Sequence, residues 1–270
     1  MIRPSSVGIW LLSCLVVTNT AMAKTTSYET AFDLKVFGFS IGQVIVSFED
    51  RISAGKTTVD ASITSPSGSV FPQGVSAFSL PVLPPWISVP VYITIKTAVG
   101  FRGPAKVGLH LEVLDYNPSL PLRLFVSDGT LGSEFKDITA YYGPGSMYTS
   151  GYRDAFSEFV IAWDGRASGD VVNTKFTDIN NYLTTNRNLI APARYQKLQV
   201  RLEEANQAYQ QNNVPESLND LEAFISSVRR AIALNEMPAT FNDPLNPNPN
   251  VAGGLIMRSE TTEFSLGLLK

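Results

Sequence analysis

Hydrophobic and polar residues alternate along the first half of the chain, from Phe32 to about Ile161. Alternation of this kind is typical of strands that bury one face, and glycine or proline at intervals of roughly ten residues is typical of antiparallel sheets. The pattern predicts about seven strands packed as an antiparallel β-sandwich. The expected strands cover residues 37–41, 43–48, 57–63, 89–95, 107–114, 122–126 and 158–163.

Two stretches of this half break the alternation, and we expect long loops there. Residues 65–90 contain six prolines and Trp86, and residues 140–155 contain four tyrosines among three glycines. Loops of this length in a packed domain are uncommon, and they often carry a binding site. The two stretches are therefore the first places to look for function.

After Trp163 the spacing of apolar residues changes from two to about 3.6, the period of an α-helix. This spacing predicts one helix over residues 169–185 and two more that form an antiparallel αα-hairpin at about 192–234. Asn212 and Asn213 lie between the two hairpin helices, and asparagine readily adopts the backbone conformation that ends a helix. The chain is therefore expected to end in a helical region.

The last twenty residues contain a further helix signal. Asn250 is a good N-cap, so we predict a helix over residues 251–261 and an extended segment over residues 263–268. This helix is expected to cover apolar residues that the hairpin leaves exposed. Ala252, Gly253 and Gly254 would allow it to approach its neighbours closely.

Taken together, the elements predict an α+β fold, with an N-terminal antiparallel β-sandwich over residues 24–166 and a C-terminal helical hairpin or bundle over residues 167–270. The sandwich is expected to fold when made on its own.

Residues 1–23 have the three parts of a cleavable signal peptide. Arg3 precedes the apolar segment 7–17, and Ala21-Met22-Ala23 is a small-x-small cleavage site. Leu11-Leu12-Ser13-Cys14 loosely resembles a lipoprotein box, but cleavage there would leave apolar residues 15–17 on the mature chain. We therefore expect an exported protein, periplasmic or extracellular, that starts at Lys24 and has no transmembrane segment.

Charge and composition narrow the set of partners. Without residues 1–23 the chain loses one of its 21 basic residues and none of its 24 acidic residues, which gives a net charge near −4. No run of lysine or arginine is present, so the sequence argues against nucleic acid as a partner. The only cysteine, Cys14, leaves with the signal peptide.

No catalytic residue and no metal ligand is assigned from sequence, and no cofactor is expected. His110 is the only histidine, so sites that need several histidines are excluded. Its strand places His110 on the opposite face from Leu109 and Leu111, which indicates a solvent-facing side chain.

Two short patterns resemble known sites without completing them. Ser133 and Lys136 match Ser-x-x-Lys, as in penicillin-binding proteins, but no Lys-Thr-Gly follows. Residues 164–175 begin like a calcium-binding loop, but Arg166 and Lys175 stand where the ion needs oxygen ligands.

Aromatic residues of the two expected loops are the candidate ligand-binding residues. Tyrosine combines an apolar ring with a polar tip, which suits recognition of sugars, peptides or proteins. The alternative is that these rings only cover one end of the sandwich. The candidates are Tyr141, Tyr142, Tyr148, Tyr152 and Trp86.

The helical hairpin has a pattern of its own: Leu202-x-x-Ala205-x-x-Ala208-Tyr209, then Asn212-Asn213, then Leu218-x-x-Leu221-Glu222-Ala223-Phe224-Ile225-x-x-Val228. This pattern resembles the FIMAH domain, a helical module at the ends of secreted bacterial proteins. The sequence departs from that family at Asn212, where glycine is usual, and after Ala233. The resemblance implies an exported bacterial protein and no particular catalysis.

These observations lead to three functional hypotheses. The first is an exported, non-catalytic binding or structural module of the bacterial cell envelope, with an envelope protein or a glycan as its partner. The second is an envelope hydrolase that uses carboxylates such as Asp154, Glu158 or Asp164. The third is an accessory scaffold subunit that docks a partner through its helical region.

Overall fold

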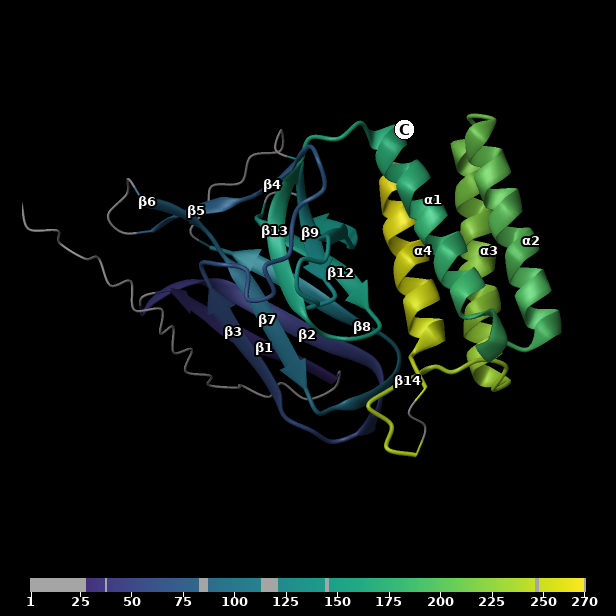
Figure 1. Ribbon diagram of the computed structural model, residues 1–270, viewed down its shortest axis with the longest axis horizontal. Coiled ribbons are helices and arrows are strands. Elements are labelled where there is room, and N and C mark those ends of the chain that lie inside the picture. Colours follow the sequence, from purple (N-terminus) through teal and green to yellow (C-terminus); the bar gives the residue numbers. More distant parts are fainter. Residues whose placement is uncertain are drawn as a thin grey trace, which may run out of the picture.

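The computed structural model describes residues 28–36, 38–82, 87–112, 121–143, 146–245 and 248–269. It has the α+β architecture expected from sequence, with two antiparallel sheets followed by a C-terminal region of four helices. Figure 1 shows the sheets on one side of the molecule and the helices on the other. The predicted signal peptide and Trp86 lie outside the described residues.

The first sheet contains six strands. Its order is β1-β2-β8-β12-β11, and the short strand β14 also pairs with β8. The strands are β1 (Tyr28–Val36), β2 (Phe39–Ser53), β8 (Gly100–Leu111), β11 (Thr139–Gly143), β12 (Tyr148–Arg153) and β14 (Thr240–Phe241). Because β14 follows the helical hairpin in sequence, the chain returns to this sheet before its last helix.

The second sheet also contains six strands and has the order β10-β9-β13-β7-β3, with β4 paired to β13. Its strands are β3 (Thr57–Ser62), β4 (Val75–Ala77), β7 (Tyr92–Thr97), β9 (Leu122–Ser127), β10 (Lys136–Asp137) and β13 (Glu158–Asp164). A separate hairpin joins β5 (Ser79–Val82) to β6 (Ile87–Pro90).

Two of the expected strands have different bounds in the structure. The strand predicted over residues 37–41 spans the turn between β1 and β2, where Gly38 has φ 84°. The strand predicted over residues 89–95 is divided between β6 and β7. Neither expected loop is free of structure, since residues 65–90 contain β4, β5 and β6 and residues 140–155 lie mainly in the β11–β12 hairpin.

The helical region contains α1 (Ser168–Thr185), the hairpin of α2 (Pro192–Gln210) and α3 (Val214–Ala233), and α4 (Val251–Gly267), with a 3₁₀ turn at Arg187–Leu189. The hairpin prediction is confirmed, and Asn212 ends α2 with φ 59°. Asn213 then caps α3 by accepting a hydrogen bond from the Glu216 amide.

Helix α4 lies between the sheets and the other helices (Figure 1). Asn250 caps it as predicted, accepting a hydrogen bond from the Gly253 amide at 3.0 Å. The extended segment predicted over residues 263–268 is wrong, because the helix continues to Gly267 and buries Ser265 and Leu266. A Cβ on Gly254 would lie 2.2 Å from the Tyr182 hydroxyl, so the glycine permits the close approach of α4 to α1.

Two large apolar clusters form the interior. One lies between the sheets and consists of sandwich residues together with Met257 of α4. The other is built by all four helices, including Leu255 and Ile256 of the same α4. Helix α4 therefore contributes to both clusters, and the polar contacts between sheets and helices lie beside it.

Candidate functional site

A surface cleft of about 420 Å³ opens where the second sheet meets the helices. It is lined by the end of β13, the start of α1 and the end of α4. Trp163 is 51% exposed on its wall, and Arg123, Ser168 and Ser265 supply polar groups. We call it the Trp163 cleft, and its remaining lining residues are Pro121, Asp164, Gly165, Arg166, Val171 and Leu268.

Sequence reasoning missed Trp163 because the alternation along β13 places its side chain on the buried face. Phe159, Ile161 and Trp163 alternate along β13, so the pattern places all three on one face. Phe159 and Ile161 are indeed buried in the sandwich core, but Trp163 lies near the strand end, where the core no longer covers it. Only the shape of the sandwich edge reveals this.

An aromatic and cationic row continues beside the Trp163 cleft. The Arg123 guanidinium, which lines the cleft, lies 5.2 Å from the centre of the Phe264 ring on α4. Tyr142 packs edge-on against the same ring, with 6.0 Å between ring centres, and is itself 41% exposed. Tyr142 does not line the cleft and is linked to it only through Phe264 and Arg123.

The structure separates Tyr142 from the other predicted tyrosines. Tyr141 is 50% exposed and contacts Tyr148 with ring centres 6.1 Å apart, and Tyr148 in turn lies 6.5 Å from His110. This trio lies on the face of the first sheet opposite the buried Leu109. Tyr152 packs partly against the sandwich core, and burial raises its pKa together with the nearby charges of Glu260 and Glu49.

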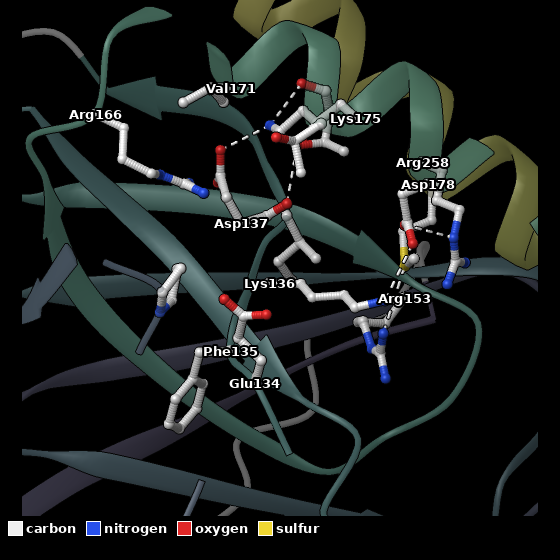
Figure 2. A pocket seen from close by; sticks show the side chains of 15 residues that line it. Glu134, Phe135, Lys136, Asp137, Arg153, Arg166, Val171, Lys175, Asp178 and Arg258 are labelled. Atoms are coloured by element: carbon white, nitrogen blue, oxygen red, sulfur yellow. Dashed lines mark hydrogen bonds and ion pairs between the residues drawn. The ribbon is translucent and has the colours of Figure 1, made fainter. Parts of the chain in front are cut away.

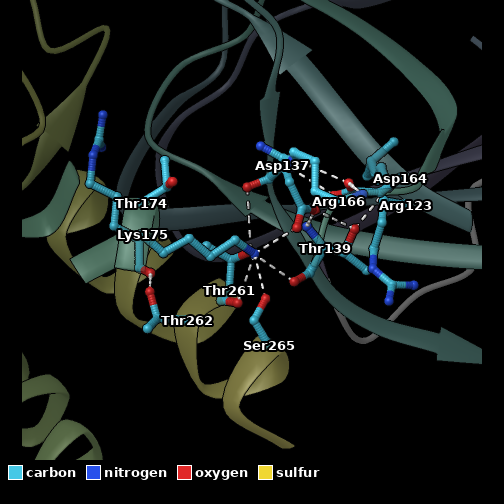
Figure 3. A network of polar contacts seen from close by, with 12 residues as sticks. Arg123, Asp137, Thr139, Asp164, Arg166, Thr174, Lys175, Thr261, Thr262 and Ser265 are labelled. Carbon is cyan, nitrogen blue, oxygen red and sulfur yellow. Dashed lines mark hydrogen bonds and ion pairs between the residues drawn. The ribbon is translucent and has the colours of Figure 1, made fainter. Parts of the chain in front are cut away.

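A second, smaller cavity of about 130 Å³ lies between β10 and the helices α1 and α4 (Figure 2). At one end Lys175 of α1 forms an ion pair with Asp137 of β10 at 2.7 Å. The Lys175 ammonium also donates to the Thr261 carbonyl at 2.9 Å and to Ser265 at 2.9 Å (Figure 3). Both charged groups are buried and held by several elements at once.

Asp137 is stabilised as a carboxylate. Burial alone would raise its pKa, but the Lys175 ammonium and hydrogen bonds from the Thr139 amide and hydroxyl hold the pKa below its usual range. Thr261 also donates its hydroxyl to the Thr139 carbonyl at 2.8 Å. This network joins β10, α1 and α4 and leaves no donor of Lys175 for a substrate, which argues for a structural role.

At the other end of the cavity, Asp178 of α1 binds two cations. Arg258 approaches it at 2.8 Å and Lys136 at 3.0 Å. The Arg258 guanidinium also lies 3.8 Å from the centre of the Tyr182 ring. Arg153 lines the same end and is nine-tenths buried (Figure 2).

The carboxylates of the hydrolase hypothesis have separate partners. Asp164 binds Arg166 through two contacts of 2.8 and 2.7 Å, and Glu158 accepts hydrogen bonds from the amide and hydroxyl of Ser67. Glu158 and Asp164 are the two ends of β13, about 20 Å apart at the rise of a strand. Paired carboxylates in glycosidases lie about 5–9.5 Å apart, so these two do not form such a pair.

Asp154 is also engaged, since its carboxylate accepts a hydrogen bond from the Tyr182 hydroxyl at 3.4 Å. The calcium-like loop is not suited to bind a calcium ion, because Arg166 forms an ion pair with the Asp164 carboxylate that the ion would need. Among the described residues, no cluster of His, Cys, Asp or Glu has the arrangement needed to hold a metal ion. Within the same residues, none of the helices is long and apolar enough to cross a bilayer.

Comparison with known proteins gives one match. The model of DUF6689, a family of unknown function, matches residues 35–270. Searches of curated proteins and of solved structures find no match. The αα-hairpin is present, but its kinship with the FIMAH domain stays a prediction.

Proposed function

The chain belongs to DUF6689, a family of unknown function, and we propose that it is an exported, non-catalytic binding module of the bacterial cell envelope whose Trp163 cleft holds a glycan. One observation carries the proposal, namely that a half-exposed tryptophan lines a cleft of about 420 Å³. This volume falls within the range of about 300–1,000 Å³ that is usual for ligand sites.

The chemistry of the cleft suits a sugar. An indole ring offers a broad apolar face against which the C–H face of a pyranose can stack, and half of the Trp163 surface is free for it. Arg123 can donate hydrogen bonds to sugar hydroxyls, while Ser168 can both donate and accept them. Stacking with a few placed polar groups gives binding without any catalytic group.

Export rests on residues 1–23, and the mature N-terminus tests it. We expect a chain that begins at Lys24 after cleavage behind Ala23. Intact-mass measurement on protein recovered from the native cell envelope gives the answer. A mass that corresponds to a start at Cys14 with added acyl chains would show a lipoprotein instead.

Ligand binding is tested with a glycan array probed with residues 24–270. We expect Trp163→Ala to weaken binding of the glycan that scores best by at least about tenfold, which corresponds to about 1.4 kcal/mol of lost stacking. Tyr141→Ala is a matched control, because Tyr141 is equally exposed but lies with Tyr148 and His110 on the first sheet. Both variants should melt close to the wild-type temperature, because exposed side chains contribute little packing.

The control also separates the competing hypotheses. Glycan binding that survives Trp163→Ala but is lost in Tyr141→Ala would move the site to the tyrosine trio and contradict the proposal. An array with no binding, together with capture of one envelope protein that both variants retain, would favour the scaffold hypothesis. Turnover of glycosides or esters by the wild type would favour the hydrolase hypothesis.

A further inference from the structure

The smaller cavity, between β10, α1 and α4, is lined by several cationic side chains. Its volume of about 130 Å³ exceeds the roughly 30 Å³ that one water molecule occupies in the liquid, so it has room for a small molecule. Cationic side chains lie at the end away from Lys175, where Lys136 and Arg258 pair with Asp178 and Arg153 lines the same end; the Glu134 carboxylate also lines the cavity (Figure 2).

Arg153 is the cation with the weakest neutralisation. Only 9% of its surface is exposed, yet the nearest carboxylate oxygen, on Asp154, lies 3.7 Å from its Nη1. Its Nε donates to the Ala155 carbonyl at 3.2 Å, and Nη1 faces the sulfur of Met257 at 3.7 Å. Among the described residues, Nη2 of Arg153 has no hydrogen-bond acceptor, and because it is not one of the fully buried polar atoms without a partner, it is accessible to a small molecule.

The nearby carboxylate of Asp178 is not free to neutralise Arg153. Lys136 and Arg258 share Asp178, so this carboxylate is already used twice. The side chain of Lys136 is 59% exposed, which places one cation at the mouth of the cavity while Arg153 lies deeper. An entering anion would therefore meet Lys136 first and Arg153 deeper in the cavity, with the carboxylates of Glu134 and Asp178 also in the lining.

Part of the lining is apolar, although Glu134, Arg166, Thr174 and Thr261 also line the cavity. Ile138 and Met257 come from the sandwich core, and Val171 comes from α1. A bare phosphate would leave these side chains without a partner. An anion with a short apolar chain would satisfy both parts of the lining.

We propose that this cavity is a binding site for a small organic carboxylate, whose oxygens pair with Arg153 and Lys136 and whose short aliphatic chain lies against Ile138 and Met257. A planar guanidinium is well matched to a carboxylate because it can donate two parallel hydrogen bonds. The site shares Arg166 and Val171 with the Trp163 cleft, but its argument does not depend on the glycan proposal.

The wild-type protein allows a direct test. Residues 24–270 labelled with ¹³C at the methionine methyl groups are titrated with butyrate, with butyramide as the neutral isostere and with inorganic phosphate. We expect butyrate alone to shift the Met257 methyl signal in a saturable way. Met147 and Met237 are internal controls, since neither lines the cavity.

A surface variant then tests the role of charge without touching the core. Lys136→Gln should raise the Kd for butyrate about fivefold, the size of one exposed ion-pair contribution. Lys56→Gln, at an exposed position in the turn between β2 and β3, should leave the Kd unchanged.

Three results would overturn the proposal. These are an unshifted Met257 signal at saturating butyrate, an equal shift with butyramide or phosphate, and an unchanged Kd in Lys136→Gln. The titration needs no variant of Arg153, so a failure of such a variant to fold would not affect the conclusion.

Discussion

The interior of each half of the molecule is apolar, whereas the seam between the halves combines apolar contacts of α4 with a network of ion pairs and hydrogen bonds. The sandwich core is made of aliphatic and aromatic residues from both sheets, and the helical core is made of similar residues from four helices. The seam also contains the ion pairs of Lys175, Lys136 and Arg229, each of which links a strand to a helix. Apolar packing supplies most of the stability of each half, because burial of apolar area is favourable in any orientation.

Polar contacts and apolar packing have different roles in this fold. Ion pairs and hydrogen bonds depend on direction, so the seam fixes how α1 and α4 lie against the sheets. Apolar side chains of similar volume can often replace a buried ion pair without loss of stability, so the seam is not needed for stability alone. Both cavities also lie along this seam, where packing is less complete.

The largest expected effect comes from leaving one charge of the seam unpaired. Lys175→Met leaves the Asp137 carboxylate buried without its cation, which we expect to lower the free energy of unfolding by about 3–5 kcal/mol. The double variant Lys175→Met with Asp137→Leu should regain most of that loss. Urea denaturation followed by tryptophan fluorescence measures both.

Lys136→Gln is the matched control for this pair, because it removes an exposed ion pair to the same helix. We expect it to cost less than about 1 kcal/mol. A Lys175→Met variant as stable as Lys136→Gln would show that the buried pair does not hold the seam.

A smaller effect is expected at the start of α4, where one residue joins the two halves. Asn250 accepts a hydrogen bond from the Gly253 amide, and its own amide donates to the Gly103 carbonyl of β8 at 2.7 Å. We expect Asn250→Ala to cost about 1–2 kcal/mol, the usual range for loss of an N-cap. Thermal unfolding of the variant checks this value.

Asn250→Asp separates the two roles of the residue. Aspartate keeps the oxygen that caps the helix but lacks the donor to Gly103. Its stability should therefore fall between those of wild type and Asn250→Ala. If it equals wild type, the hydrogen bond to the sheet contributes nothing.

Local patterns predicted the architecture well, because each core is formed by residues with regular spacing. The helix over residues 169–185 and the hairpin at 192–234 follow from that spacing, and Asn212 and Asn250 mark helix ends through chemistry that is local to the chain. The end of α4 was wrong for a related reason. Its last residues are buried by elements distant in sequence, which a local pattern does not contain.

The candidate site was predicted only in part. Tyr142 is linked to the Trp163 cleft only through Phe264 and Arg123, and Trp163 itself follows the pattern of a core residue. Arg153 stands on a strand where alternation places it with buried residues, and nothing local shows that its charge faces a cavity. Sites at a seam depend on contacts between distant segments, so single-sequence reasoning reaches them only by chance.

The smallest effect concerns pH, and it arises on the face of α4 near α3. Burial raises the pKa of Glu263 to about 8, and the neighbouring carboxylates Glu260 and Glu222 add to this. In the unfolded chain its pKa is near 4.5, so folding favours the protonated form. Its contribution to stability is therefore complete below about pH 4.5 and is lost as the pH rises through about 8.

Replacement of this carboxyl by an amide should remove that pH dependence. Glu263→Gln should unfold at nearly the wild-type urea concentration at pH 4.5 but at a higher concentration at pH 9, with a gain on the order of 1 kcal/mol, because the group's partial exposure screens the charge. Glu204→Gln, at an exposed position of α2, is the control and should follow the wild type at both pH values. Equal pH dependence in Glu263→Gln and wild type would mean that the charge of Glu263 is solvated in the folded state. This part of α4 would then be open to water, and the seam would end before it.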